Sequence, residues 1–307
     1  MTESVPLSID AGRLCHVGMN VLSGEAVISL RADEPLQLCR LTCGEHTFSF
    51  DPAYYTVYQG VKDFVLEIVC DEGIVQDVRV WQDEASEPAP DRSIRLTAPF
   101  VWPRRALLIG NSLLTGFGHY GMCASGPEHD FCAHVTRVLR AVQPDVSIHK
   151  LRISDFEGSV TLAQARTWMC GPLQEALEAK PELVIIQCGD NVNTPEKLAV
   201  YRTSCEELLS FVRRALPYAQ VALVGEWYAT EEKQTLMAEA CCRTGCAFVD
   251  IEGLRSERTM GKVGNHYLLE DGTQGVIDSE GVASHPGDAG MEAIAQKIMD
   301  VLGMQEA

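Results

Sequence analysis

The sequence predicts two domains, an all-β sandwich or jelly roll over residues 1–100 and an α/β domain over residues 101–307. Three observations predict this division. Short β-type runs fill the first part of the chain, with few helical stretches between them. In the second part, strand-like and helix-like runs alternate, which is typical of a parallel sheet covered by helices on both faces. An acidic, Pro-containing segment at residues 83–93 separates the two parts.

The β-type runs of the first domain are separated by turn residues and lie at residues 25–32, 36–43, 46–51, 64–70 and 75–82. In the first of them, Val27, Ser29 and Arg31 alternate with Ile28 and Leu30. This is the period of a half-buried strand. So many short strands in succession favour a sandwich or a jelly roll.

The strands of the second domain are predicted at residues 106–110, 146–151, 182–188, 220–227 and 247–251. Helices are predicted between them and after them, at residues 130–142, 161–177, 196–216, 231–244 and 288–302. The middle strands are almost continuously apolar, as expected for strands covered on both faces. In such sheets the chemistry lies at the carboxyl ends of the strands.

Charge and hydropathy exclude several classes of partner. The formal net charge is −18 and the sequence pI is about 4.8, with no run rich in Lys or Arg, so we expect neither nucleic acid nor an anionic membrane as a partner. No apolar run approaches the roughly 20 residues needed to span a bilayer. The first residues carry no readable secretory signal. We therefore expect a soluble, cytoplasmic protein of undetermined oligomeric state.

The 12 cysteines are scattered, many of them inside apolar runs, which favours buried reduced thiols over a disulfide scaffold. Cys39 and Cys43, and likewise Cys242 and Cys246, are close enough in sequence to bind zinc together. Neither pair has a matching second pair or a histidine at ligand spacing. We expect no metal and no cofactor.

Three polar residues fall at the predicted active edge of the sheet. Ser112 follows the first strand of the α/β domain, Asn191 follows the third, and His285 precedes the last helix. A serine there can attack a substrate, an Asn amide can donate to an oxyanion, and an imidazole can accept the proton. Each residue alone is explained as readily by turn or capping chemistry. Their joint occurrence favours a catalytic group.

These blocks resemble the SGNH hydrolase superfamily, also called GDSL esterases and lipases. The match falls on Gly110 and Ser112, on Gly158, on Gly189 and Asn191, and on His285, over about residues 105–302. The resemblance implies a flavodoxin-like three-layer sandwich. It also implies that Ser112 attacks an ester carbonyl, and that the N–H groups of Ser112 and Gly158 and the Asn191 amide form the oxyanion hole.

The chain departs from this family at two positions. Asn111 stands where the family has Asp, and Val282 stands where it has the Asp that orients the histidine. Asp278, Glu280 and Glu226 could each replace that acid, and so could a backbone carbonyl. We favour a Ser112/His285 dyad oriented by a main-chain oxygen, with Glu280 as the leading carboxylate alternative.

Residues 252–283 are Gly-rich and could fold over the site as a lid, or could be an ordinary surface excursion. His266 in this segment and His119 near Ser112 are candidates for substrate contact.

The predicted activity is that of a serine esterase that removes small acyl groups, such as acetyl, from a carbohydrate through an acyl-enzyme. The two-domain layout resembles deacetylases of this superfamily that carry an N-terminal jelly roll. Two alternatives stay open: a general short-chain esterase or lysophospholipase, and an inactive carbohydrate-binding module.

Overall fold

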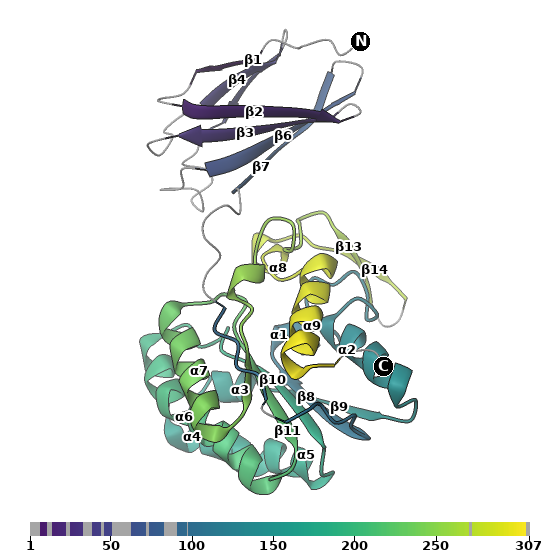
Figure 1. Ribbon diagram of the computed structural model, residues 1–307, viewed down its shortest axis with the longest axis vertical. Helices are drawn as coiled ribbons and strands as arrows, with labels where there is room; N and C mark the ends of the chain where they lie inside the picture. The colour runs from purple at the N-terminus through teal and green to yellow at the C-terminus, as the bar shows by residue number, and fades with distance from the viewer. Residues whose placement is uncertain are drawn as a thin grey trace. The chain divides into compact units, whose positions relative to one another are not determined.

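The computed structural model describes residues 7–10, 14–22, 25–32, 39–43, 46–50, 63–71, 74–82, 91–96, 98–269 and 272–304. The chain divides into two compact units, Met1–Pro88 and Ala89–Ala307 (Figure 1). The predicted boundary at residue 100 stays a prediction. Most of the acidic segment expected to mark it, residues 83–90, lies outside the described residues.

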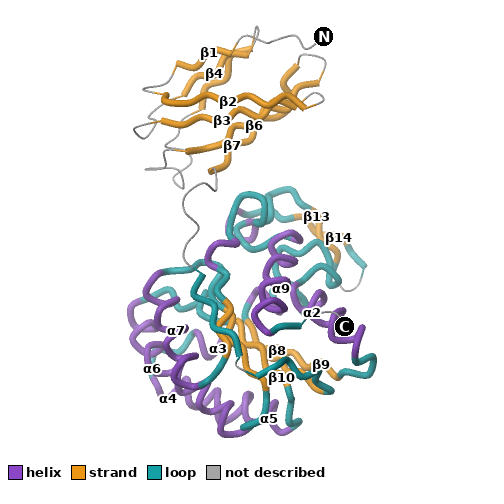
Figure 2. The backbone as a smooth tube through the Cα atoms, in the orientation of Figure 1, coloured by secondary structure: helices purple, strands orange, loops and turns teal. Residues whose placement is uncertain are grey.

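The described residues of the first unit form antiparallel strands in two sheets (Figure 2). One sheet has the order β1-β4-β5 and the other β2-β3-β6-β7. The strands are β1 (Leu7–Asp10), β2 (Leu14–Leu22), β3 (Glu25–Ala32), β4 (Cys39–Cys43), β5 (His46–Phe50), β6 (Asp63–Asp71) and β7 (Ile74–Gln82). The all-β character agrees with the alternating sequence pattern, whereas the jelly-roll topology remains a prediction.

The second unit is built on a five-stranded parallel sheet with the order β12-β11-β10-β8-β9. Its strands are β8 (Arg105–Gly110), β9 (Ser147–Arg152), β10 (Leu183–Gln187), β11 (Gln220–Val224) and β12 (Ala247–Val249). Each of them falls within or next to a run that the sequence marked as a strand. The predicted parallel α/β sheet is therefore confirmed.

Alternate side chains of the central strands enter two separate hydrophobic cores. Leu107 and Val184 belong to the core beneath the helices of residues 162–215 and 231–244, whereas Leu108 and Ile185 belong to the core beneath the helices of residues 131–142 and 288–302. Both faces of the sheet are therefore covered, as Figure 1 shows, which explains why these strands read as continuous apolar runs.

The helices follow the predicted ranges closely: α2 (Phe131–Val142), α4 (Leu162–Trp168), α5 (Gln174–Glu178), α6 (Pro195–Ala215), α7 (Glu231–Thr244) and α9 (Asp288–Leu302). The single helix predicted at 161–177 is interrupted by a π-helical turn, Met169–Leu173, that contains Pro172. Proline has no N–H and clashes with the preceding turn, so an uninterrupted α-helix through this position is disfavoured.

Several short elements were not predicted: α1 (Ser112–Thr115), α3 (Ser154–Glu157), the 3₁₀ turn Glu252–Leu254, the hairpin of β13 (His266–Leu268) with β14 (Gln274–Val276), and α8 (Glu280–Ala283). Each spans only three or four residues, too few to carry a readable periodicity.

The strand order places a topological switch point between β8 and β10. From β8 the chain crosses to β9 on one side, then returns past β8 to β10 on the other. Loops on either side of such a point run in opposite directions and leave a crevice at the carboxyl ends of the two strands. Ser112 follows β8 and Asn191 follows β10, so both residues lie at this edge. In the part of the chain that the structure describes, no helix is long and apolar enough to cross a membrane.

Candidate active site

Ser112 is the first residue of α1, directly after the turn that ends β8. Asn111 caps this helix, because its side-chain oxygen accepts the Leu113 N–H at 3.1 Å. Gly110 allows α1 to pack closely on the end of β8, since a Cβ atom there would lie 2.7 Å from the Leu114 Cβ. Within residues 98–269 and 272–304, the Ser112 N–H has no hydrogen-bond acceptor. The hydroxyl and the N–H are thus both available at the edge of the sheet.

His285 lies against Ser112, although 173 residues separate them in sequence. The His285 Nε2 atom is 3.0 Å from the Ser112 Oγ atom. Hydrogen bonds fix the backbone around the histidine: Gly261 N–H donates to the His285 carbonyl at 2.9 Å, and the Trp227 indole donates to the Ser284 carbonyl at 2.8 Å. Ser112 and His285 are therefore held together by packed, partly buried segments.

Main-chain oxygens orient the imidazole. The Nδ1 atom is 3.0 Å from the Gly281 carbonyl oxygen and 3.2 Å from the Val282 carbonyl oxygen. Carbonyl oxygens only accept hydrogen bonds, so Nδ1 carries the proton in the neutral ring and Nε2 accepts from the Ser112 hydroxyl. The Tyr228 hydroxyl also lies 3.3 Å from Nδ1. This is the arrangement expected of a dyad oriented by the backbone.

The three carboxylates considered for this role lie elsewhere. Glu226 is fully buried and forms an ion pair with Lys233. Asp278 and Glu280 are exposed, and among the described residues no hydrogen bond or ion pair joins either of them to His285. Val282 contributes to orientation through its carbonyl rather than through its side chain.

We expect the pH dependence of kcat/KM to reflect a His285 pKa below the ordinary value of 6.5. Burial lowers the pKa of His285, while the Gly281 carbonyl and the charge of Asp190 oppose this shift without cancelling it. If the neutral ring is the base, activity falls as His285 becomes protonated, so the midpoint of the acid limb lies below 6.5. A pH profile of kcat/KM between about pH 5 and 8 measures this. An acid limb with an apparent pKa above 6.5 would contradict the geometry.

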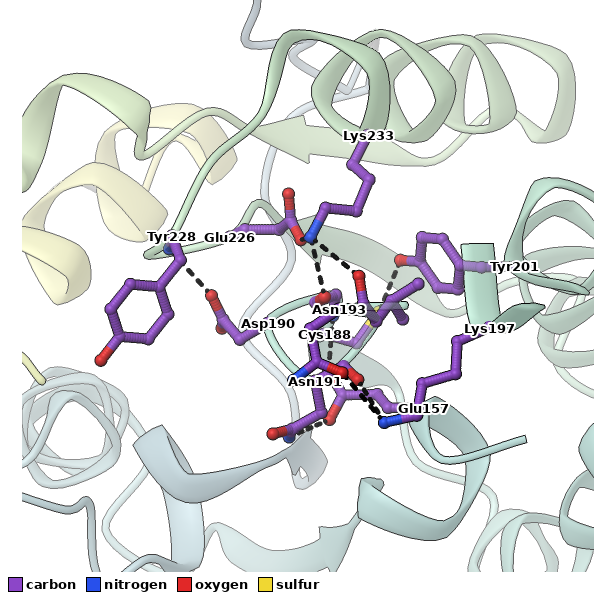
Figure 3. A network of polar contacts seen from close by, with 12 residues as sticks. Glu157, Cys188, Asp190, Asn191, Asn193, Lys197, Tyr201, Glu226, Tyr228 and Lys233 are labelled. Carbon is purple, nitrogen blue, oxygen red and sulfur yellow. Dashed lines mark hydrogen bonds and ion pairs between the residues drawn. The ribbon is translucent and has the colours of Figure 1, made fainter. Parts of the chain in front are cut away.

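Asn191 lies in the loop after β10, and its side-chain amide contacts a buried carboxyl group. The Nδ2 atom donates to the Glu157 Oε2 atom at 2.7 Å (Figure 3). Two lysines hold the carbonyl side of the same loop: Lys197 Nζ donates to the Asn191 carbonyl at 3.0 Å, and Lys233 Nζ to the Val192 carbonyl at 3.2 Å. The second N–H of the Asn191 amide remains for another acceptor.

Gly158 does not have the environment that the resemblance implies. It follows α3 directly, is exposed, and its N–H donates to the Ser154 carbonyl at 2.9 Å. A donor committed to a helical hydrogen bond cannot also bind an oxyanion. Of the three predicted donors, the Ser112 N–H and the second N–H of the Asn191 amide therefore stay available, and their role as oxyanion donors remains a prediction.

His119 and His266 are both exposed. The His119 carbonyl accepts from Lys150 at 2.8 Å, and His266 begins β13. Their role as substrate contacts remains a prediction.

The segment 252–283 packs on the loop that follows Ser112. Phe117 and Tyr267 stack with ring centroids 4.1 Å apart, and the Leu268 N–H donates to the Ser125 carbonyl at 2.8 Å. Asp288 ties the same loop to α9 by accepting from both the N–H and the hydroxyl of Ser125. Whether the segment opens and closes as a lid stays a prediction.

Glu157, the last residue of α3, was not predicted as part of the site. Burial raises its pKa to about 7, hydrogen bonds from Asn191, Asn111 and the Gly189 N–H oppose that shift, and the charge of Asp190 adds to it. In the sequence, Glu157 is simply the acidic residue that precedes Gly158. Nothing in the local pattern distinguishes it from a solvent-exposed glutamate.

Asp190 and Tyr228 were also not predicted. Asp190 accepts from the Asn111 amide at 3.2 Å, from the Gln187 amide at 2.6 Å and from the Tyr228 N–H at 3.0 Å. It therefore links the turn that carries Ser112 to the tyrosine beside His285. Figure 3 shows the contact between Asp190 and Tyr228. Its position directly before Asn191 is the sequence feature that could have indicated Asp190 as part of the site.

Comparisons with known proteins give structural similarity at low sequence identity. No protein-family model matches the chain, and no curated protein matches it. A structure from Bacteroides uniformis described as a GDSL-like lipase is 12% identical, with a TM-score of 0.41, and covers 67% of this chain and 97% of its own. An acetyl xylan esterase from Butyrivibrio proteoclasticus is 12% identical, with a TM-score of 0.39 and coverages of 98% and 90%.

A family two carbohydrate esterase from Clostridium thermocellum, solved with cellohexaose, is 13% identical, with a TM-score of 0.39 and coverages of 97% and 89%.

Proposed function

We propose that the chain is a serine carboxylic ester hydrolase that removes small acyl groups from carbohydrate esters. Acetyl is the leading candidate for the acyl group. The observation that carries the proposal is the 3.0 Å contact between Ser112 Oγ and His285 Nε2, with Nδ1 held by two backbone carbonyls. A serine, a base and an orienting acceptor within hydrogen-bond reach are the arrangement that acyl transfer requires.

The reaction proceeds in two halves. His285 Nε2 takes the Ser112 proton as Oγ attacks the ester carbonyl, and the resulting oxyanion accepts from the Ser112 N–H and the Asn191 amide. Collapse breaks the bond to the alcohol, which leaves with the proton from His285, and Ser112 remains acylated. Water then attacks the acyl group in the same way, His285 returns the proton to Ser112, and the carboxylic acid is released.

Labelling with a fluorophosphonate probe tests the serine mechanism, and a substrate screen tests the specificity. We expect the probe to modify Ser112, and acetylated sugars and short nitrophenyl esters to be hydrolysed faster than long-chain esters. Absence of labelling at Ser112 in the folded protein would favour the alternative of an inactive carbohydrate-binding module. The departure at Val282 supports that alternative, but the two backbone acceptors at His285 make an acid there unnecessary.

A short-chain esterase or lysophospholipase is the second candidate, favoured by exposed apolar side chains on the β13–β14 hairpin. Leu268 and Val276 are both exposed, and the pairing of His266 with Val276 places them on one face of the hairpin. Val263, just before it, is exposed as well. An apolar acyl chain could contact this face. Activity that rises with acyl chain length in the screen would select this candidate.

We expect Asn191→Ala to lower kcat far more than it raises KM. An oxyanion donor acts mainly in the transition state, and removal of one costs on the order of 10² to 10³ in rate. Steady-state kinetics on an acetyl ester measure both constants. A change confined to KM would instead make Asn191 a substrate-binding residue.

A further inference from the structure

Glu157 is a buried carboxyl group that the mechanism above does not use. Its side chain is 1% exposed, and it accepts three hydrogen bonds. Asn111 Nδ2 donates to Oε1 at 3.0 Å, the Gly189 N–H donates to the same oxygen, and Asn191 Nδ2 donates to Oε2 at 2.7 Å. The donors come from two loops far apart in sequence, and Figure 3 shows the Asn191 side of the network.

These contacts join the two loops that carry the proposed chemistry. Asn111 directly precedes the nucleophile, whereas Gly189 and Asn191 belong to the loop after β10. A carboxylate offers acceptors on both oxygens, so a single side chain can serve donors from both loops. A neutral amide offers one acceptor and one donor, and could not accept at both ends.

The contact to Asn191 fixes a direction as well as a position. The amide group is planar, so once one Nδ2 hydrogen points at Glu157, the direction of the other is set. The backbone of the loop has separate supports, since Lys233 donates to the Gly189 carbonyl at 3.3 Å and Lys197 to the Asn191 carbonyl. Loss of the Glu157 carboxylate would therefore free the Asn191 side-chain amide to rotate, while the two lysines still hold the backbone of the loop.

We propose that Glu157 is a positioning residue that aims the Asn191 amide and, through Asn111, couples it to the turn that presents Ser112. This inference rests on the proposed esterase function. It identifies the residue that fixes the orientation of the oxyanion donor in the same site. Glu157 acts through Asn191 and Asn111 and does not touch the substrate.

The same network explains why an amide stands at position 111. Asn111 Nδ2 donates both to Glu157 and, at 3.2 Å, to Asp190 Oδ2. A carboxylate at this position would replace that donor with a third acidic group facing the other two, at a site that is fully buried. Carboxylates placed next to one another in a buried site repel each other strongly.

The first experiment compares Glu157→Gln with the parent in steady-state hydrolysis of an acetyl ester. We expect kcat to fall about tenfold to a hundredfold, a smaller loss than removal of the donor itself, with KM changed less than about threefold. Glu175→Gln is the matched control, because Glu175 is exposed on α5 and should leave both constants unchanged. Thermal unfolding of each variant shows whether the fold is retained.

The second experiment tests the coupling between the two loops. Asn111→Asp alone should lower kcat more than about tenfold, because it adds a carboxylate beside Glu157. Asn111→Asp combined with Glu157→Gln should be more active than Asn111→Asp alone, since the repulsion is relieved. Losses that simply multiply in the double variant would show that the residues act independently and would overturn the proposal.

The outcomes for this inference and for the esterase function are separable. Fluorophosphonate labelling of the parent at Ser112 establishes the serine mechanism without reference to Glu157. If the parent is labelled and hydrolyses esters while Glu157→Gln keeps the full kcat, the positioning role alone fails. If the parent is neither labelled nor active, the proposed function fails first.

Discussion

Ser112→Ala is expected to abolish ester hydrolysis, lowering kcat by on the order of 10⁴ to 10⁶. The methyl group cannot form the acyl-enzyme, and it cannot donate a hydrogen bond to His285 Nε2. The fold should persist. Ser112 is only half-buried, and loss of its contact to His285 costs about 1 kcal/mol, the net contribution of an ordinary hydrogen bond.

Hydrolysis of an acetyl ester, fluorophosphonate labelling and thermal unfolding together measure this result. Thr115→Ala is a suitable control, because Thr115 ends the same short helix and its hydroxyl only donates to the Asn111 carbonyl at 3.3 Å. Turnover in Ser112→Ala comparable with that of the parent would remove the nucleophile from the assignment.

The positions of Ser112, Asn191 and His285 were predictable because parallel strands bring their carboxyl ends to one edge. Apolar runs located the strands, and turn residues located the loops that follow them. The strand order then places β8 beside β10. Ser112 and His285 are far apart in sequence, so no local pattern predicts that they lie together. That prediction came from the expected parallel sheet and from the resemblance of the sequence blocks.

The environments of Glu157 and Gly158 could not be predicted in this way. The motif pointed to Gly158, but formation of the four-residue helix α3 commits its N–H to Ser154 and turns Glu157 inward. Burial of a carboxyl group depends on donors from loops elsewhere in the sequence, so no local property of residues 154–159 distinguishes it. The interruption at Pro172, in contrast, could have been predicted from the proline alone.

His285→Ala should lower kcat by on the order of 10⁴ to 10⁶, whereas Glu226→Ala, Asp278→Ala and Glu280→Ala should each retain most of the parent kcat. In the proposed mechanism the histidine accepts the proton of Ser112. The carboxylates are not its partners, because Asp278 and Glu280 are exposed and Glu226 pairs with Lys233. Kinetics on the four variants with one acetyl ester measure the contrast.

Glu226→Ala needs a separate control, because it leaves Lys233 buried without its partner, and removal of one member of a buried pair is strongly destabilising. Glu226→Gln keeps the volume, and unfolding of both variants separates lost stability from lost chemistry. The backbone acceptors at Gly281 and Val282 survive every one of these carboxylate substitutions. A folded Asp278, Glu280 or Glu226 variant that loses several orders of magnitude in kcat would therefore overturn the dyad and identify the missing acid.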